Sequence, residues 1–589
     1  MPEYLAPGVY VEETSFRAPS IEGVGTSTAA FVGPTLTGPF SPDPAQQVDP
    51  NPPELLTSFG DFAAIYGGYG NFSFVADPND AKNVNYVALS VKAFFDNGGS
   101  RLYVSRVFTP KAANDTGLAT AGAVADDKVG LTARFPGSYL NKQTVTVTLN
   151  AVRTQQLGQL PPGSTLVQLD KDEHNNVTQS LFSNGAGGDF KQIGGGNAVP
   201  DPVKNQVYLA TVTVSAPAAS GATSVFEGLG LSSDHPLYVG KVLGQNPPRR
   251  IDALENQIAF VVGKNVTADK LFAEFFSDWS DATKTASKTY KLDGGNDGGA
   301  PVDANYENAL KSLEALEDIA IVAAPGSSAY DIADAVVQSV LKHVERTRAY
   351  RVAILDTPPN SIASQAQDFR SKIDSTRAAL YTPWVITANP LARPGTSIPA
   401  EISVPPSGFM AGIYARNDQQ HSVAKAPANE VVLGALRFER NINFAEQGLL
   451  NPLGINCLRF FPGRGYRVWG ARNATSNQEL KYVNVRRYLV YLEHSIDNGT
   501  QWAVFENNGP LLWARVKESV EEFLYNEFAE NNLLGTSPAE AYFVRCDRST
   551  MTQNDLDNGR LICLIGVALL KPAEFVIFRI GQKTADARS

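Results

Sequence analysis

Three glycine-rich segments hold residue types that could bind phosphate or a metal ion. Leu292–Gly299 (LDGGNDGG) is not followed by the Gly-Lys-Ser/Thr of a phosphate-binding loop, and its aspartate spacing differs from that of an EF-hand. Asp555–Gly559 (DLDNG) lacks the third ligand and the terminal glutamate of a calcium loop. Around Gly463 and Gly465 the third glycine of a dinucleotide fingerprint is displaced. We interpret these segments as turns and loops, and we expect no cofactor and no metal.

The nucleophiles and general bases do not converge in the sequence either. The five histidines form no HxxxH or HExxH pair, and Ser407 in PPSGF does not stand in the GxSxG elbow of a hydrolase. The three cysteines, Cys457, Cys546 and Cys563, include no CxxC pair. They therefore predict free thiols in a reducing compartment rather than a zinc site or a disulfide framework. We expect a protein that is not an enzyme.

The composition is that of a soluble protein with several domains. Of 589 residues 43% are hydrophobic and 19% charged, and the usual domain size predicts three or four domains. The net charge of -10 argues against direct nucleic-acid binding, because phosphates need an excess of Lys and Arg. The longest apolar run, Ile562–Leu570, is far shorter than the ~18 residues of a membrane span. With no secretory signal visible, we expect assembly in the cytoplasm without membrane insertion.

Short strand-like segments lie near both ends of the chain. Val9 and Val11 alternate with Tyr10 and Glu12, which predicts a strand. The segment 573–580 (AEFVIFRI) predicts another strand, carrying Phe575, Val576, Ile577 and Phe578. A single strand is not stable in water, because its backbone groups need partners. The sequence therefore raises the question of where these two strands find theirs.

The interior of the chain changes character along its length. Strand-like runs such as Arg351–Pro359 (RVAILDTPP) alternate with helix-like segments on both sides of residues 111–250, which predicts βαβ units and a parallel or mixed sheet. Residues 111–250 instead alternate Thr and Val between glycine-rich loops, which predicts an inserted all-β module. The predicted fold class is multidomain α/β (α+β), with mixed-sheet core domains and a β-rich insertion.

The C-terminal part contains a strongly amphipathic helix, predicted over 512–530. Its apolar face carries Val516, Val520, Phe523, Leu524 and Phe528. Its charged face carries Arg515, Lys517, Glu518, Glu521, Glu522 and Glu527. A charged face is usually just solvated, since exposed ion pairs contribute only ~0–1 kcal/mol. The alternative is contact with a partner of complementary charge, and the sequence leaves both readings open.

Several segments, taken in order along the chain, together resemble one family. They are LAPGVYVEE, VKAFFDNGGSRLYVSRV, LDGGNDG, IAIVAAPG, RVAILDTP, AALYTPWV, VPPSGFMAGIYARND, KAPANE, LNPLGINCLRFFPGRGYRVWGARN and YVNVRRYLVYLEHSI. The family is that of the contractile tail sheath proteins of bacteriophages and related injection machines. Residues 111–250 contain none of these segments, and sheath proteins commonly carry a variable module there that faces away from the tube.

The resemblance implies a structural subunit of a phage tail or a phage-tail-like injection particle. Sheath subunits stack as hexameric rings around an inner tube and contract, on a signal from the baseplate, to drive the tube through a target envelope. The implied partners are other copies of this chain, the inner tube protein, and baseplate and terminal cap proteins. Lys517, Glu518, Glu521 and Glu522 then become a possible tube contact.

The resemblance also implies partners for the two terminal strands. In this family an N-terminal arm pairs in a neighbour's C-terminal sheet, beside a C-terminal arm from another neighbour. The implied domains are an N-terminal arm (1–26), a middle α/β domain in two parts (27–110 and 251–430), a β-rich outer module (111–250) and a C-terminal domain with its arm (431–589).

Two functions of other classes stay open at this point. One is a hydrolase that uses the α/β region, and the other is a glycan- or receptor-binding protein that uses the β-rich insertion. The segment Val404–Asp418 (VPPSGFMAGIYARND) also has two interpretations. It forms either an intersubunit or domain-junction loop, or a packed connection within one subunit.

Overall fold

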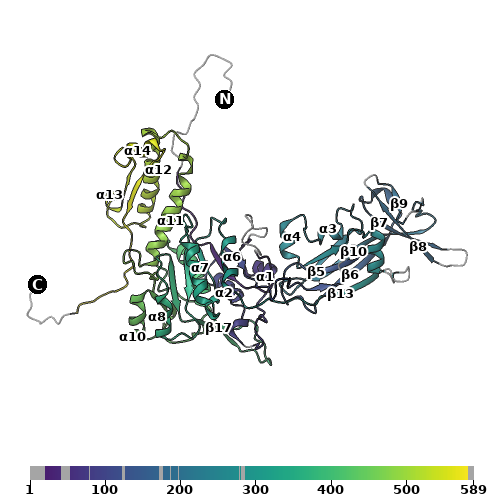
Figure 1. Ribbon diagram of the computed structural model, residues 1–589, viewed down its shortest axis with the longest axis horizontal. Coiled ribbons are helices and arrows are strands. Elements are labelled where there is room, and N and C mark those ends of the chain that lie inside the picture. The colour runs from purple at the N-terminus through teal and green to yellow at the C-terminus, as the bar shows by residue number, and fades with distance from the viewer. Residues whose placement is uncertain are drawn as a thin grey trace, which may run out of the picture.

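The computed structural model describes residues 20–40, 53–78, 80–122, 127–171, 177–185, 188–194, 196, 198–276, 279 and 285–580. The strand predicted over Val9–Glu12 lies outside these residues. The molecule is elongated, with a β-rich part extending to one side of the helical and mixed-sheet body (Figure 1). No helix in the described ranges is both long and apolar enough to cross a membrane.

A mixed eight-stranded sheet organises the body. In spatial order its strands are β2 (Leu55–Leu56), β3 (Leu102–Arg106), β1 (Ala29–Gly33), β14 (Ile321–Ala323), β15 (Val352–Asp356), β16 (Ala378–Thr382), β20 (Ile455–Phe461) and β21 (Gly465–Trp469). The strands from β3 to β20 pair in parallel, while β2 and β21 add antiparallel edges. The sheet type agrees with the βαβ alternation of the sequence.

Helices bury both faces of this sheet. In β1, Ala29 and Phe31 enter one core, while Ala30 and Val32 enter the other. The first core is completed by α1 (Phe59–Tyr66), α2 (Tyr86–Asp96) and α9 (Pro406–Gln420). The second is completed by α6 (Asp303–Ser312), α7 (Ala333–Val344), α8 (Ala363–Ser371) and α10 (Phe444–Leu450). Burial on both faces explains why these strands are continuous apolar runs in the sequence.

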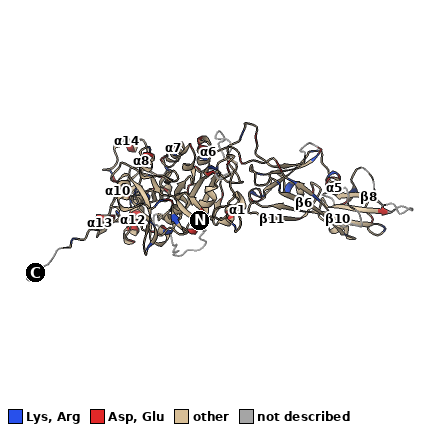
Figure 2. Cartoon of the chain, turned by 90° about the horizontal axis from the view of Figure 1, so that it is seen from below, with Lys and Arg blue, Asp and Glu red and all other residues tan. Residues whose placement is uncertain are grey.

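Two further sheets form from the chain between β3 and β14. The larger contains β13 (Thr285–Lys291), β6 (Thr144–Arg153), β10 (Gln206–Pro217), β7 (Thr165–Lys171), β8 (Val177–Asn184), β9 (Phe190–Gln192) and, beside β10, β11 (Thr223–Leu229). The smaller contains β12 (Ile258–Val262), β5 (Val129–Ala133) and β4 (Thr120–Ala121). One apolar cluster joins both sheets to α5 (Ala268–Phe276) and α3 (Val239–Val242), whereas Leu254 of α4 (Arg250–Glu255) packs in the first core of the body. Figure 2 shows β6 and β10 on the opposite side of the molecule from α8 and α10.

The C-terminal part is built on a pair of long helices. They are α11 (Val483–Gly499) and α12 (Pro510–Ala529), followed by α13 (Pro538–Ala541), β22 (Tyr542–Arg545), α14 (Gln553–Asp557) and β23 (Leu564–Val567). Tyr488, Leu492, Val520 and Phe523 form the core between the two long helices. A small sheet of β18 (Glu401–Val404), β17 (Val385–Ala388) and β19 (Arg437–Phe438) completes the body.

The sheets cross two of the boundaries drawn from the sequence. β12 pairs with β5, and β13 pairs with β6, so the β-rich part continues past residue 250 to about residue 291. β20 pairs with β16, so the central sheet continues past residue 430. Both boundaries depend on pairing between strands that are distant in the sequence, and local composition does not reveal such pairing.

Candidate assembly surfaces

A two-stranded antiparallel sheet lies in the C-terminal part of the molecule. β22 and β23 pair from Tyr542↔Val567 to Arg545↔Leu564. Val544 on one face is buried in the core beneath α12, while Phe543 on the other face is 55% exposed. A sheet of two strands is marginal in water, and an open edge can accept another strand. This sheet is therefore a candidate acceptor.

The chain after β23 leaves the domain without forming a strand of its own. Residues 571–580 have no regular secondary structure, so the strand expected over 573–580 is not formed within this chain. Its side chains are exposed by 72% at Phe575, 68% at Val576, 77% at Ile577 and 83% at Phe578. Figure 1 shows this end pointing away from all labelled elements. Consecutive exposed apolar residues mark a surface for a partner.

Glu574 fixes the point at which this segment leaves the body. Its carboxylate accepts hydrogen bonds from Arg472 Nε at 2.8 Å and Nη2 at 2.5 Å. It also accepts from Asn451 Nδ2 at 2.7 Å and the Tyr482 hydroxyl at 3.1 Å. Hydrogen bonds from Arg472 and Asn451 hold the pKa of Glu574 below its usual value despite burial, which raises it. The exposed residues therefore start from a fixed anchor.

The opposite end of the described chain is anchored as well. Ile21 packs into the core between α11 and α12, and Val24 N donates to Ser495 Oγ at 3.1 Å. Residues 20–26 were assigned to the free N-terminal arm from the sequence. The structure instead shows that Ile21, Val24 and Thr26 are packed against α11. Residues 20–26 are therefore part of the folded molecule and not of a free arm.

A buried ion pair connects residues 20–26 to α9 and α11. Arg487 of α11 donates to Asp418 just inside α9 through Nη1 at 2.8 Å and Nη2 at 2.6 Å. The Thr26 hydroxyl donates to Asp418 Oδ2 at 2.6 Å, and Arg487 Nη2 donates to the Thr26 carbonyl at 3.1 Å. The guanidinium also lies 4.7 Å from the centre of the Tyr414 ring. We call these residues the Arg487 junction.

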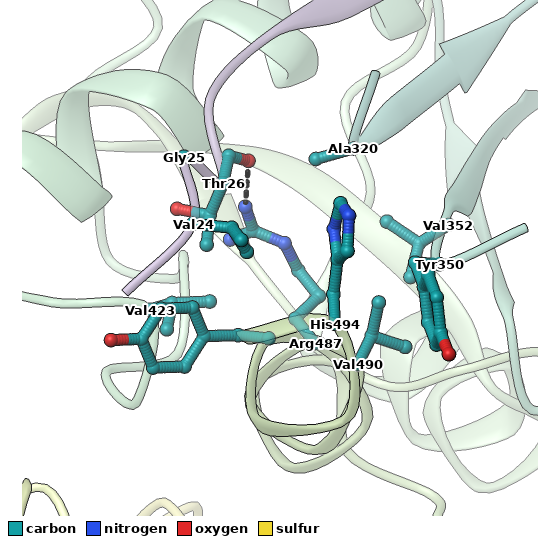
Figure 3. Close-up of a pocket in the computed structure, with 11 residues that line it drawn as sticks. Val24, Gly25, Thr26, Ala320, Tyr350, Val352, Val423, Arg487, Val490 and His494 are labelled. Atoms are coloured by element: carbon teal, nitrogen blue, oxygen red, sulfur yellow. Dashed lines mark hydrogen bonds between the residues drawn. The ribbon is translucent and has the colours of Figure 1, made fainter. Parts of the chain in front are cut away.

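The Arg487 junction borders a small cavity between the body and the C-terminal helices. Figure 3 shows Arg487, Val490 and His494 on one side of α11, with Val352 and Tyr350 opposite. The cavity holds about 20 Å³, which is room for a single water molecule but not for a substrate. His494 stacks on Tyr350 at 4.7 Å, and burial lowers its pKa. The geometry is that of a packed domain junction.

The structure decides between the two interpretations of the segment Val404–Asp418. It forms the end of β18 and most of α9, and α9 is buried along nearly its whole length. Ser407 has no exposed surface, and its hydroxyl donates to Asp356 Oδ2 at 2.6 Å and its amide to Oδ1 at 2.7 Å. Burial raises the pKa of Asp356 to about 7, against the lowering effect of these two bonds. The segment is a packed helix whose end, Asp418, belongs to a domain junction.

Two glycines explain how α9 packs so closely. A Cβ atom at Gly412 would lie 2.4 Å from the Phe94 carbonyl oxygen of α2, and one at Gly408 would lie 2.6 Å from Ser90 Cβ. The motif VPPSGFMAG therefore records a close helix contact rather than a ligand site.

The amphipathic helix α12 has the buried face that the sequence predicts. Val516, Val520, Phe523 and Leu524 are buried. Lys517 and Glu521 form a half-exposed ion pair at 3.6 Å, and Glu518 and Glu522 are exposed. Whether this face contacts a tube stays a prediction.

Glu527 was placed on the same charged face from the sequence, and this placement is wrong. Its side chain is buried. The hydroxyls of Tyr488 and Tyr491 each donate to its carboxylate at 2.7 Å, and Asn532 Nδ2 donates at 3.0 Å. Three donors compensate the loss of water around the charge.

No group of residues in the described ranges is arranged to hold a metal ion. An open hollow lies beside α7 and the end of α8, and most of the side chains that line it are charged. These are already paired: Lys342 with Glu307, Arg346 with Glu314 and Lys372 with Asp334.

Comparison with known proteins identifies two similar domains in the second half of the chain. Residues 299–474 match the family model of the phage tail sheath protein central domain, and residues 475–583 match that of the phage tail sheath C-terminal domain. The tail sheath protein of Vibrio phage KVP40 is 22% identical over 358 residues, which cover 56% of this chain and 52% of that protein. A putative prophage major tail sheath protein of Pseudomonas aeruginosa is 25% identical over 266 residues, covering 44% of this chain and 64% of that protein. The matches thus span about half to two thirds of these relatives.

Solved structures extend the likeness in fold over nearly the whole chain. The sheath complex of the extracellular contractile injection system PVC, in its contracted state, aligns over 99% of both chains with a TM-score of 0.50 and 19% identity. The contracted helical sheath of the anti-feeding prophage aligns over 98% of this chain and 100% of its own, with a TM-score of 0.52 and 18% identity. The resemblance to contractile tail sheath proteins seen in the sequence is therefore confirmed: residues 299–583 match two domain models of that family, and both curated relatives are named as tail sheath proteins.

Proposed function

We propose that this chain is the repeating subunit of a contractile sheath. It stacks as hexameric rings around an inner tube and shortens to drive that tube through a target envelope. The observation that carries the proposal is the exposed apolar segment Phe575–Phe578, which leaves a fixed anchor at Glu574. A segment of this composition needs a partner, and a second copy of the chain offers the two-stranded β22–β23 sheet.

Strand addition by both termini would complete that sheet. The segment Phe575–Phe578 enters beside β22 and β23 of a neighbour, and Val9–Glu12 of another neighbour enters as well. Four or five backbone hydrogen bonds at ~0.5–1.5 kcal/mol net would give each arm on the order of a few kcal/mol. Burial of Val576 and Phe578 adds a comparable amount. The completed sheet would also have fewer open edges.

The anchors suit a lattice that must change shape without falling apart. Each arm begins at a rigid point, at Glu574 for one end and at the Arg487 junction for the other. The domains can then move as whole bodies while the arms bend between their anchors and the neighbouring sheet, as in a hinge motion. The contacts that hold the lattice together are kept through the movement.

The remaining partners follow from the same role. Lys517, Glu518, Glu521 and Glu522 of α12 are the proposed contact with the inner tube, where weak charge contacts summed over many subunits hold the extended state. Baseplate and terminal cap proteins bind the two ends of the sheath, and assembly takes place in the cytoplasm. The β-rich part between β3 and β14 faces outward and does not drive contraction.

The test is to place a charge on the proposed arm. Val576→Glu should give a folded, soluble chain that no longer forms cylinders, because a carboxylate on the buried face of the shared sheet has no partner. Val203, which is 92% exposed in the β-rich part, provides the matched control Val203→Glu. Electron microscopy should show cylinders from the control chain alone. Normal cylinders from Val576→Glu would refute the arm contact.

A further inference from the structure

Two of the three cysteines face each other at the open end of the β22–β23 ladder. The register pairs Arg545 with Leu564, and one more step along both strands sets Cys546 opposite Cys563. Opposed residues of an antiparallel pair have Cα atoms about 4.5–5.5 Å apart, inside the range of about 4.4–6.8 Å that a disulfide requires. Strand pairing therefore supplies the geometry of a cross-strand disulfide.

The two side chains point to the same face and are in contact. Cys546 continues the alternation of the buried Val544, and Cys563 that of Ile565, which is opposite Val544. Both side chains pack in the same apolar cluster. Cys546 is 4% exposed and packs with Trp513 and Val516 of α12. Both cysteines are free in this structure.

The surroundings leave this pair open to slow oxidation. Cys563 is half-buried, so a small reagent can reach its sulfur. Burial raises the pKa of both thiols, to about 12 for Cys563, with smaller contributions from Asp547 at Cys546 and Glu521 at Cys563. The Lys517 ammonium on α12 acts in the opposite direction and lowers the pKa of both. Thiolate character sets the rate of exchange.

We propose that Cys546 and Cys563 form a dithiol that closes to an intrachain disulfide in the presence of an oxidising small-molecule disulfide. The thiolate of Cys563 attacks the reagent, forms a mixed disulfide and releases one reduced thiol. The thiolate of Cys546 then attacks the Cys563 sulfur and releases the second. Two protein thiols lose two electrons and two protons, and the reagent is reduced to two thiols. A reducing environment reverses the reaction.

The disulfide would link β22 and β23 at the end of their paired region. Beyond Arg545 and Leu564 the chain loops through α14, and β22 and β23 have no further pairing on that side. A covalent link at Cys546 and Cys563 holds the register of a sheet that is otherwise two strands wide. The proposal concerns the isolated chain and does not depend on the sheath function.

Cys457 provides an internal control. It lies in β20 with no exposed surface, and its register partners are Thr382 and Trp469. It has no second thiol within its strand pairs, so the same reagent should leave it reduced.

The experiment titrates thiols of the full chain after incubation with oxidised glutathione under native conditions. Denatured samples should contain one free thiol per chain instead of three, and non-reducing peptide mapping should show Cys546 linked to Cys563. Cys457→Ser should still lose two thiols, whereas Cys546→Ser should not form the linked peptide. Three free thiols in the wild-type chain would overturn the proposal. A persistent glutathione adduct on Cys563, or links between chains, would overturn it as well.

Discussion

The Arg487 junction concentrates the energy of the domain contact in a few residues. The side chains of Arg487 and Asp418 are 3% and 6% exposed, so removing one leaves the other charged, buried and uncompensated. We expect Arg487→Met to lower the free energy of unfolding by about 3–5 kcal/mol, measured by denaturant titration. The exposed Arg437–Glu401 pair at 2.8 Å is the control, and Arg437→Met should cost ~0–1 kcal/mol. Equal effects at the two sites would contradict the assignment of the junction.

Some residues of these surfaces are legible in the sequence and others are not. Val516, Val520 and Phe523 follow from helical spacing alone, and the structure buries them. Arg487 left a signal that sequence reasoning missed, since a charged residue inside the apolar run YVNVRRYLVY indicates a buried partner. The pairing of Glu574 with Arg472 gave no signal in the sequence, because it joins positions about a hundred residues apart.

At the scale of elements, the close contact of α9 with α2 is the most specific packing feature. Gly412→Ala should destabilise the chain by about 1–3 kcal/mol, because the new methyl group overlaps the Phe94 carbonyl. Gly448 in α10 is the matched control, since a Cβ there meets nothing within 4 Å. Gly448→Ala should stabilise by about 0.5–1 kcal/mol through helix propensity. Thermal unfolding of both variants checks the pair, and stabilisation by Gly412→Ala would show that the helices separate easily.

The outward face of α12 gives a prediction that belongs to the assembled particle. Reversal of Glu518, Glu521 and Glu522 to lysine should reduce the yield of tube-filled, extended particles when the chain is assembled with its tube. The contact should also weaken as salt rises, since the Debye length falls from ~10 Å at 0.1 M to ~3 Å at 1 M. Particle counts by electron microscopy measure both effects. Unchanged yields would mean that this helix faces elsewhere.

Element-level reasoning from the sequence succeeded where patterns are local. The βαβ alternation predicted a parallel or mixed sheet, which the structure has, and the Thr/Val alternation predicted strands, which form as β6 and β10. The prediction that residues 111–250 are an inserted all-β module stays a prediction. The boundaries at 250 and 430 were wrong because β13 returns to pair with β6, and β20 with β16. The strand expected over 573–580 is absent from the single chain, and under the proposed function it forms only when a neighbour supplies the sheet.

At the scale of the whole molecule, the described chain carries a surface that no part of it covers. The two-stranded acceptor and the exposed segment Phe575–Phe578 are present in one molecule, yet they do not pair with each other. Under the proposed function, a donor segment and an acceptor sheet on each copy let many copies join into a repeating assembly.

The most direct test is an electron micrograph of the purified full-length chain, compared with a chain that ends at Glu574. The full chain should form striated hollow cylinders of uniform diameter. The truncated chain retains β22, β23 and the helical core, so it should stay folded and appear as separate small particles. Cylinders of the same diameter from both chains, or separate particles from both at high concentration, would contradict assembly through strand addition by the C-terminal segment.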